Sequence, residues 1–366
     1  MAWTDAARCL LLATGTACGS EYAIVDPIDV DPALVLPCGF TAVAGTPIRA
    51  YDCNPVFTGT NEDWTDGIGA VAMRAQPLLG HPVYQLWYTT ADQPGDGGWA
   101  LGHAVSTNGV DWQPHPDNPI LESTGGWDAD GMEQLAVVWD ARRNHYTLAY
   151  QGYDLDPVDN TFGLGVLTAA DGVSFRYPDD REPILDLSRV QAGRDYCWPL
   201  SLQYVDGDYT GLLAGSDVGD QQCQIYTFET STVTQPFVLD AEPILAAGPQ
   251  LYDRTGMVSA AYVPATETEP ALLFYVGFEE WRSAGANLVT PEGLSLAVAT
   301  SMDEGVTWSK LPENPLPIAT EGIGPTHVAA QRVGSRVHLW VTADHPELGQ
   351  QAVDYYIWET VQTEGT

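Results

Sequence analysis

Carboxylates, aromatic residues and a few arginines gather in five short segments of this 366-residue chain. Each segment stands just before an apolar run, and the five cover residues 64–68, 127–133, 194–199, 253–257 and 321–327. Cleavage of a glycosidic bond requires two carboxyl groups, because one protonates the leaving oxygen while the other activates water or attacks directly. Carboxylates that crowd together also raise one another's pKa, which keeps an acid protonated near neutral pH. These segments therefore carry the candidate chemistry, provided that the fold brings them together.

Internal repeats in the sequence predict a fold that brings the five segments together. A proline landmark recurs at Pro55, Pro119, Pro183, Pro243 and Pro315, which stand 60 to 72 residues apart. A turn-like landmark precedes four of them, at 106–112, 170–175, 231–237 and 301–308, and its last copy matches the structural Asp-box turn of sialidases. The runs between landmarks are rich in aromatic and β-branched residues and bounded by turn formers, which indicates strands. Repeats of about four strands predict an all-β, five-bladed β-propeller.

The same spacing predicts how the ring closes. Ile48 lies seven residues before Pro55, as Trp112 lies seven before Pro119, so residues 46–51 resemble the outer fourth strand of a blade. This segment nevertheless precedes the first blade. In the last blade, the sequence ends before a fourth strand of its own. We therefore expect the N-terminal strand to close the last blade, which leaves no unpaired edge.

In a propeller the innermost strand of each blade lines the central channel, so the five segments are expected to converge at one mouth. The catalytic candidates are Asp66, Glu133, Asp130 and Asp195, and Glu133 is in register with His327, which points it towards the channel. The substrate-binding candidates, among them flat aromatic faces for sugar rings, are Trp64, Trp127, Tyr196, Trp198, Asp253, Arg254 and His327.

Structural interpretations stand beside these assignments. Asp66-Gly67 and Asp130-Gly131 are also common turn dipeptides. Asp195 next to Arg194 fits an ion pair as well as an acid, and Asp253 with Arg254 fits a blade cap as well as a substrate contact. His327 fits a hydrogen-bonded channel residue or a metal partner better than a proton shuttle.

With these residues the chain resembles the five-bladed superfamily of arabinanases, levansucrases and invertases, particularly glycoside hydrolase family 43. The resemblance covers nearly all of residues 45–360 and rests on the blade pattern, on Asp66 and on the stretch 324–328, which is similar to the Gly-Pro-Gly-His-Asn motif of that family. It implies that Asp66 is the general base or nucleophile and that Asp130 or Glu133 is the second-blade carboxylate. It also implies that His327 helps to hold a channel calcium ion, through a water molecule, with no other cofactor required.

The third blade departs from the family pattern. The resemblance implies a general-acid glutamate at its entry, but residues 194–198 read Arg-Asp-Tyr-Cys-Trp. Two classes of function therefore stay open. One is a glycosidase acting on a poly- or oligosaccharide, and the other is a non-catalytic propeller that binds glycans or proteins.

Composition excludes several other classes. The chain has 49 Asp and Glu against 14 Lys and Arg, a formal net charge of −35. No basic surface exists to displace counterions from nucleic-acid phosphates, so a nucleic-acid partner is excluded. The shortage of arginine also disfavours a sialidase and a glycan phosphorylase, which need cationic groups for a carboxylate or a phosphate. With 45% hydrophobic residues the chain can bury a core, which excludes wholesale disorder.

The N-terminus is typical of an exported protein. Arg8 precedes three leucines and a run of small residues, and Ala17-Cys18 resembles a bacterial lipobox. We expect a signal peptide over 1–17, acylation of Cys18, a linker over 18–43 and a single propeller domain over 44–366. The protein would then be a monomeric periplasmic or outer-surface lipoprotein, or a secreted protein, with no transmembrane segment.

Four cysteines remain in such a mature chain, namely Cys38, Cys53, Cys197 and Cys223. An even number in an exported protein predicts two disulfides, for which three connectivities are possible. Proximity in the sequence favours Cys38–Cys53 and Cys197–Cys223. No cysteine pair has the close spacing of a zinc site.

Overall fold

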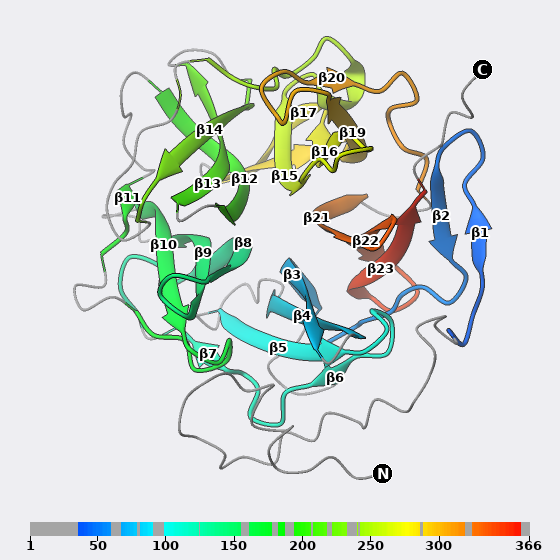
Figure 1. Ribbon diagram of the computed structural model, residues 1–366. Helices are drawn as coiled ribbons and strands as arrows, with labels where there is room; N and C mark the ends of the chain where they lie inside the picture. Colours follow the sequence, from blue (N-terminus) through cyan, green and yellow to red (C-terminus); the bar gives the residue numbers. More distant parts are fainter. Residues whose placement is uncertain are drawn as a thin grey trace.

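The structure is a computed structural model that describes residues 36–59, 67–78, 81–90, 99–123, 125–154, 161–177, 182–186, 194–205, 208–217, 222–232, 240, 242–285, 288–318 and 324–359. Five antiparallel sheets form blades around a central channel, as Figure 1 shows, and a sixth sheet of two strands is a separate hairpin. The described residues contain one short 3-10 turn, η1 (Leu251–Asp253), and otherwise strands and connections. The predicted all-β, five-bladed propeller is thus confirmed.

Each blade runs from an inner strand outwards. Blade 1 consists of β3 (Ile68–Leu78), β4 (His81–Thr90), β5 (Ala100–Ser106) and β6 (Gln113–Pro114), with β7 (Leu121–Glu122) also paired to β5. Blade 2 consists of β8 (Gly131–Asp140), β9 (His145–Asp154), β10 (Thr161–Ala169) and β11 (Leu185–Asp186). Blade 3 consists of β12 (Arg194–Val205), β13 (Asp208–Asp217) and β14 (Gln224–Thr230).

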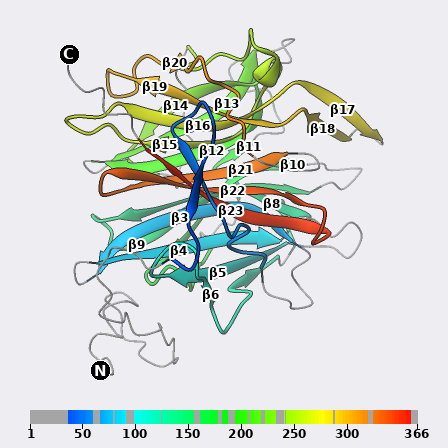
Figure 2. The same ribbon diagram turned by 90° about the vertical axis from the view of Figure 1, so that its right-hand side faces the viewer.

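The last two blades carry additions to this plan. Blade 4 consists of β15 (Gly256–Val263), β16 (Ala271–Phe278), β19 (Ser295–Ser301) and β20 (Ser309–Lys310), with a hairpin of β17 (Glu280–Gly285) and β18 (Leu288–Glu292) inserted after β16. Blade 5 consists of β21 (Pro325–Val333), β22 (Arg336–His345) and β23 (Gln350–Trp358), joined on the outside by β2 (Ile48–Tyr51) and β1 (Phe40–Ala42). Figure 2 shows the inserted hairpin projecting beyond the blades at the right-hand side.

The hydrophobic core is divided among the interfaces between blades. Every residue of β5 and β16 is buried, because both faces of a middle strand are covered by neighbouring blades. Such strands favour aromatic and β-branched residues, which fit a pleated surface that is packed on both sides. Five clusters each join two neighbouring blades, through the pairs Trp87 and Leu148, Ala149 and Leu213, Ile225 and Leu273, Val298 and Val341, and Tyr355 and Leu86.

The proline landmarks attach to the third strand of a blade. The first residue after each proline donates its N–H to a third-strand carbonyl, in the pairs Ile120–Leu101, Ile184–Leu164, Ile244–Ile225, Leu316–Leu296 and Val56–Val353. In the last of these pairs the landmark at Pro55 docks on β23 of blade 5, although it precedes blade 1 in the sequence. The five landmarks therefore occupy equivalent places around the ring.

The landmark asparagines strengthen this attachment. Asn314 accepts the N–H of Val298 at 3.0 Å and donates to its carbonyl at 2.8 Å. Asn54 makes the same pair of bonds with Tyr355, at 2.8 and 3.1 Å. Because a side-chain amide carries both a donor and an acceptor, it continues the ladder as a backbone group would.

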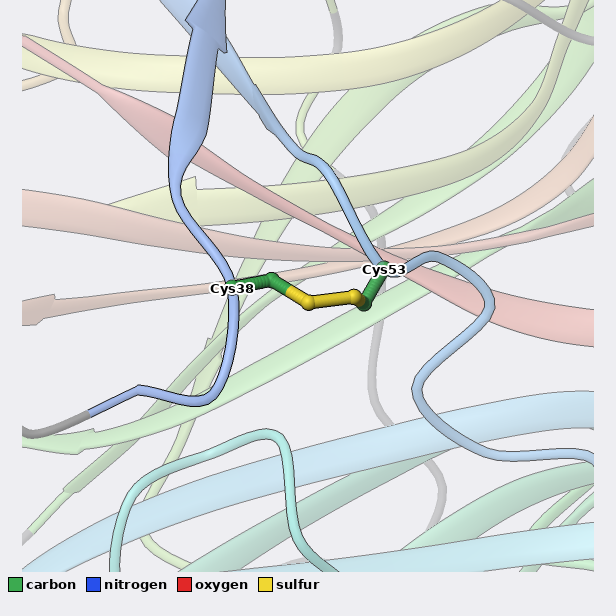
Figure 3. The surroundings of a disulfide bond; sticks show 2 residues. All are labelled: Cys38 and Cys53. Atoms are coloured by element: carbon green, nitrogen blue, oxygen red, sulfur yellow. A yellow bond between two sulfur atoms is a disulfide. The ribbon is translucent and has the colours of Figure 1, made fainter.

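The N-terminal segment packs along the outside of blade 5. β2 pairs with β23 in the register Ile48↔Trp358, and β1 pairs with β2 outside it (Figure 1). A disulfide joins Cys38, before β1, to Cys53, after β2, as Figure 3 shows. This predicted disulfide is confirmed. Cys223 is also disulfide-bonded, whereas the side chain of Cys197 lies outside the described residues, so the Cys197–Cys223 pairing stays a prediction.

The turn-like landmarks have a structural role. Asp303 accepts the N–H and the hydroxyl of Thr307 at 2.8 and 2.7 Å, and the hydroxyl of Ser301 at 2.8 Å. These bonds to the ionised carboxylate lower the pKa of Asp303 to about 2. Asp171 accepts the N–H groups of Val173 and Ser174 in the same way. The turns follow the third strands, so they lie at the far end of the blades from the starts of the inner strands.

The attachment of Asn54 generates a stability prediction. Replacing Asn54 with Ala leaves the N–H and carbonyl of buried Tyr355 without these partners, and each such loss costs about 1–3 kcal/mol. Asn314→Ala is the matched control, because it removes the equivalent bonds inside blade 4. We expect urea unfolding to show comparable losses of stability for both variants. An unchanged midpoint in Asn54→Ala beside a lowered one in Asn314→Ala would show that the N-terminal attachment adds nothing.

Candidate functional site

The five inner strands, β3, β8, β12, β15 and β21, begin at one end of the channel, which we call the mouth. Each inner strand contacts the next around the ring, and β21 contacts β3. The second strand of each blade returns to this end, as the pair Gly256↔Phe278 shows in blade 4. The inserted hairpin β17–β18 therefore also projects at the mouth (Figure 2).

Every inner strand carries a β-bulge or related irregularity close to its start. The register shifts fall between Ile68 and Val71, Glu133 and Ala136, Tyr196 and Leu200, Met257 and Ser259, and Pro325 and His327. A bulge adds a residue to one strand, bends it and re-aims the side chains beside it. All five inner strands have such an irregularity near the mouth. The direction of the side chains there therefore departs from the regular alternation of a strand.

The described side chains meet across the channel at one point. Gln134 lies in the bulge of β8, and its Nε2 is 3.0 Å from Nε2 of His327 on β21. β8 belongs to blade 2 and β21 to blade 5, so this bond spans the channel past the intervening blade 1. His327 is partly exposed. Desolvation of its ring by burial nevertheless lowers its pKa to about 4. The imidazole is therefore uncharged at neutral pH.

Two of the predicted catalytic carboxylates lie at the mouth end of blade 2. Asp130 directly precedes β8, is half-buried and donates its N–H to the carbonyl of Tyr153 at 3.0 Å. Glu133 is half-buried, stands opposite Gln151 in the ladder and immediately precedes the bulge. The residue that reaches His327 is Gln134, the neighbour of Glu133. The bulge is the reason, because it redirects the side chains that a regular strand would alternate.

Trp127 and Asp128 form part of the wall of blade 2. The indole of Trp127 stacks on Tyr150 with a centroid distance of 5.7 Å and an interplanar angle of 17°. It also covers Gly152, where an added Cβ would come within 2.8 Å of the indole. Asp128 is fully buried and accepts the hydroxyl of Tyr150 at 2.6 Å. One face of the predicted sugar platform is thus occupied by protein.

Asp253 has the same place in blade 4. Like Asp128 before β8, it stands three residues before its inner strand, is fully buried and accepts a tyrosine hydroxyl, that of Tyr275 at 3.0 Å. Lys310 pairs with it at 2.6 Å. Burial raises the pKa of Asp253, and the ammonium of Lys310 opposes that rise. These contacts are those of a residue that holds a blade together.

Arg254 is exposed near the mouth. Its Nε donates to the carbonyl of Glu279 at 3.2 Å, and its guanidinium lies 3.9 Å from the carboxylate of Glu280. Arg282 on the inserted hairpin pairs with Glu292. The cations described at this part of the mouth therefore already have acidic partners.

Several predicted residues lie outside the described part of the chain. Asp66 and Trp64 are among them, with Asp66 directly before the described Gly67 and β3. The backbone of Asp195, Tyr196 and Trp198 lies in β12, but their side chains are not described. The expected meeting of carboxylates from three blades thus stays a prediction.

Neither a metal-binding cluster nor a membrane-spanning helix is present among the described residues. Among them no group of three or more His, Cys, Asp and Glu side chains is arranged to hold a metal ion. The calcium expected near His327 stays a prediction. The described residues also contain no helix with the length and apolar character needed to cross a bilayer.

Comparison with protein families and with curated proteins found no match to this chain. Solved structures do match its fold. A β-1,2-mannobiose phosphorylase from Listeria innocua aligns with a TM-score of 0.57 and 13% identity over 85% of this chain and 96% of its own. The catalytic domain of a Coprinopsis cinerea family-62 α-L-arabinofuranosidase aligns with a TM-score of 0.54 and 11% identity over 84% and 95%. A thermostable family-43 glycoside hydrolase aligns with a TM-score of 0.53 and 16% identity over 82% and 91%.

The chain therefore shares the five-bladed propeller fold of these enzymes, as the resemblance to family 43 and its relatives implied. At such identities the likeness concerns the fold. The chemistry has to be argued from the residues at the mouth, because one fold hosts many activities.

The neutral state of His327 generates a prediction. Its folded pKa of about 4 lies below the ordinary value of 6.5, so its ring signals should stay constant in NMR spectra from pH 8 to about pH 5. His327→Gln assigns those signals by their loss. As pH falls from about 6.5 towards 4, the unfolded chain takes up a proton that the folded chain refuses, so this group lowers stability in that window. A midpoint near 6.5 in the folded protein would contradict the assigned environment.

Proposed function

We propose that this protein is an exported glycoside hydrolase that cleaves O-glycosidic bonds of an oligo- or polysaccharide at the mouth of the propeller channel. The observation that carries the proposal is the position of Asp130 and Glu133 at the bulged start of β8, at the mouth end of blade 2. The printed descriptions of the structural neighbours, an arabinofuranosidase and a family-43 hydrolase among them, support the same class of substrate.

Hydrolysis of the glycosidic bond uses two carboxyl groups with different catalytic roles. Asp66 is the base that activates water or attacks the anomeric carbon, and Glu133 is the acid that protonates the leaving oxygen. Glu133 takes the acid role because no glutamate stands at the entry of blade 3, where residues 194–199 contain Asp195 alone.

A neutral sugar is the substrate that fits the charge of the protein. A net charge of −35 repels anionic ligands, whereas a neutral glycan carries no charge to be repelled. The same argument separates hydrolysis from the phosphorolysis of the mannobiose phosphorylase. A phosphate co-substrate needs cations, and Arg254 and Arg282 at the mouth are paired with Glu280 and Glu292.

A second candidate is a glycan-binding propeller without catalysis. The observation that favours it is the absence of a glutamate from residues 194–199. The two candidates differ in one measurable respect, because a binding module retains glycans and releases no reducing ends. Screening the purified protein against arabinan, xylan, fructan and mannan oligosaccharides distinguishes them.

Two substitutions test the catalytic roles. Asp66→Asn keeps the shape of the side chain but removes the base, so we expect kcat to fall roughly 10²-fold or more. Glu133→Gln should reduce activity on natural substrates much more than on nitrophenyl glycosides, because an activated leaving group departs without protonation. Asp111→Asn is the control, since Asp111 is exposed on the turn after β5 at the far end of the blade.

The outcomes separate the possible roles. Equal losses on both kinds of substrate in Glu133→Gln would exclude Glu133 as the acid. Full activity in Asp66→Asn would exclude the mechanism as a whole. A parent protein that binds a glycan of the panel and releases no sugar would establish the binding module instead.

Export is the cellular part of the proposal. A disulfide such as Cys38–Cys53 persists in oxidising compartments, which agrees with removal of residues 1–17 and acylation of Cys18. Mass spectrometry of the native protein is expected to show a chain that begins at Cys18 and carries a diacylglyceryl group. A chain that begins at Met1 would contradict export, and an unmodified start elsewhere would indicate ordinary secretion.

A further inference from the structure

A chain of hydrogen bonds crosses the channel just inside the mouth. Gln134 Nε2 lies 3.0 Å from His327 Nε2, and His327 Nδ1 lies 3.2 Å from Thr326 Oγ1. Thr326 Oγ1 lies 3.5 Å from Gln351 Oε1 and 3.4 Å from the carbonyl of Thr342. We infer that Gln134 is a positioning residue, which fixes the tautomer of His327 and ties the carboxylate-bearing start of β8 to the opposite side of the channel. Its catalytic consequence rests on the proposed function.

The backbone of Gln134 is the first sign of this role. Three described residues other than glycine have a positive φ, namely Gln134 at 49°, Asn144 at 55° and Glu304 at 60°. Asn144 and Glu304 lie in turns, whereas Gln134 lies inside β8. The left-handed conformation is unfavourable for a residue with a Cβ, because the Cβ lies too close to the following carbonyl oxygen. Strain of this kind persists where surrounding contacts hold it, and here the contact is the bond to His327.

With the amides of Gln134 and Gln351 oriented as they are in the structure, the donors and acceptors of the chain fit in one direction. The amide nitrogen of Gln134 donates and cannot accept, so Nε2 of His327 must be the acceptor. The neutral ring then carries its proton on Nδ1, which donates to the hydroxyl oxygen of Thr326. That hydroxyl donates onwards to Gln351 or to the carbonyl of Thr342. Gln134 therefore determines which nitrogen of His327 is protonated.

The two ends of the chain stand beside the candidate carboxylates. Gln134 directly follows Glu133 on β8. At the other end, a Cβ added to Gly67 would lie 3.2 Å from the backbone nitrogen of Gln351, so β23 packs closely on the residue that follows Asp66. Gly67 has a φ of 101°, which glycine tolerates far better than other residues. Blades 1, 2 and 5 are thus linked at the level of the proposed chemistry.

The tautomer of His327 tests the inference directly. Long-range ¹H–¹⁵N correlation spectra at pH 7 are expected to show the proton on Nδ1 in the parent protein. Gln134→Glu replaces the donor with a carboxylate that accepts, so Nε2 of His327 should become protonated. Gln134→Gly removes the donor and also relieves the positive φ, so it is expected to fold and to show a mixture of tautomers.

Gln331→Leu is the matched control for these spectra. Gln331 lies four residues after His327 on β21 and accepts the N–H of Ala75 at 2.9 Å, which links two blades deeper in the channel. Its replacement removes an inter-blade bond and should leave the proton on Nδ1. The inference is overturned if the parent carries the proton on Nε2, or if Gln134→Glu leaves it on Nδ1 alone.

Kinetics separate this inference from the proposed function. With an active parent, Gln134→Gly is expected to lower kcat about 10-fold or more with little change in KM, because misplaced catalytic groups slow the reaction step. Unchanged kcat together with an altered tautomer would overturn the positioning role while leaving hydrolysis in place. With an inactive parent the spectra still decide whether Gln134 controls His327, so failure of the proposed hydrolysis is distinguishable.

Discussion

The attachment of residues 48–57 to β23 joins the N-terminal part of the described chain to its last blade. Blade 5 acquires its two outer strands, β2 and β1, from the other end of the chain, in addition to the three strands β21, β22 and β23 of its own segment. Val56 and Asn54 bind β23 in the way that the other landmarks bind their own third strands. The disulfide between Cys38 and Cys53 ties the base of β1 and β2 together. The N-terminal part of the described chain and its last strand are therefore held together at the outside of a blade.

The plan of the blades was predictable because it repeats. The proline landmark recurs five times in the sequence and the turn landmark four times, with aromatic strand-like runs between them, so every copy supports the others. The hydrogen bonds of Asn54 and Asn314 explain why an amide suits the landmark position. Glu182 and Glu242 stand at that position in two blades, where Ile184 and Ile244 still bind the third strand through the backbone.

The direction in which individual side chains point at the mouth was harder to predict from the sequence. The alternation of a regular strand directed attention to Glu133 as the partner in register with His327, but the bulge after it gives that place to Gln134. A bulge depends on how one strand pairs with the next, and nothing in the residues 131–136 announces it. Likewise, Asp128 and Asp253 resemble site residues in sequence, and only their burial and tyrosine partners show what they hold.

The separation between frame and rim explains how this fold accommodates different chemistries. Landmarks and third strands carry the attachment of each blade, and they lie away from the channel. Some residues of the segments before the inner strands, such as Asp128 and Asp253, hold their blades, whereas a change at other positions leaves the pairing of the strands in place. Structures with 11 to 16% identity accordingly share the fold with this chain. The departure at residues 194–198 is a change of this kind, because β12 pairs with β13 as the other inner strands pair with theirs. The chemistry that we propose for this protein consequently depends on a few residues at the rim.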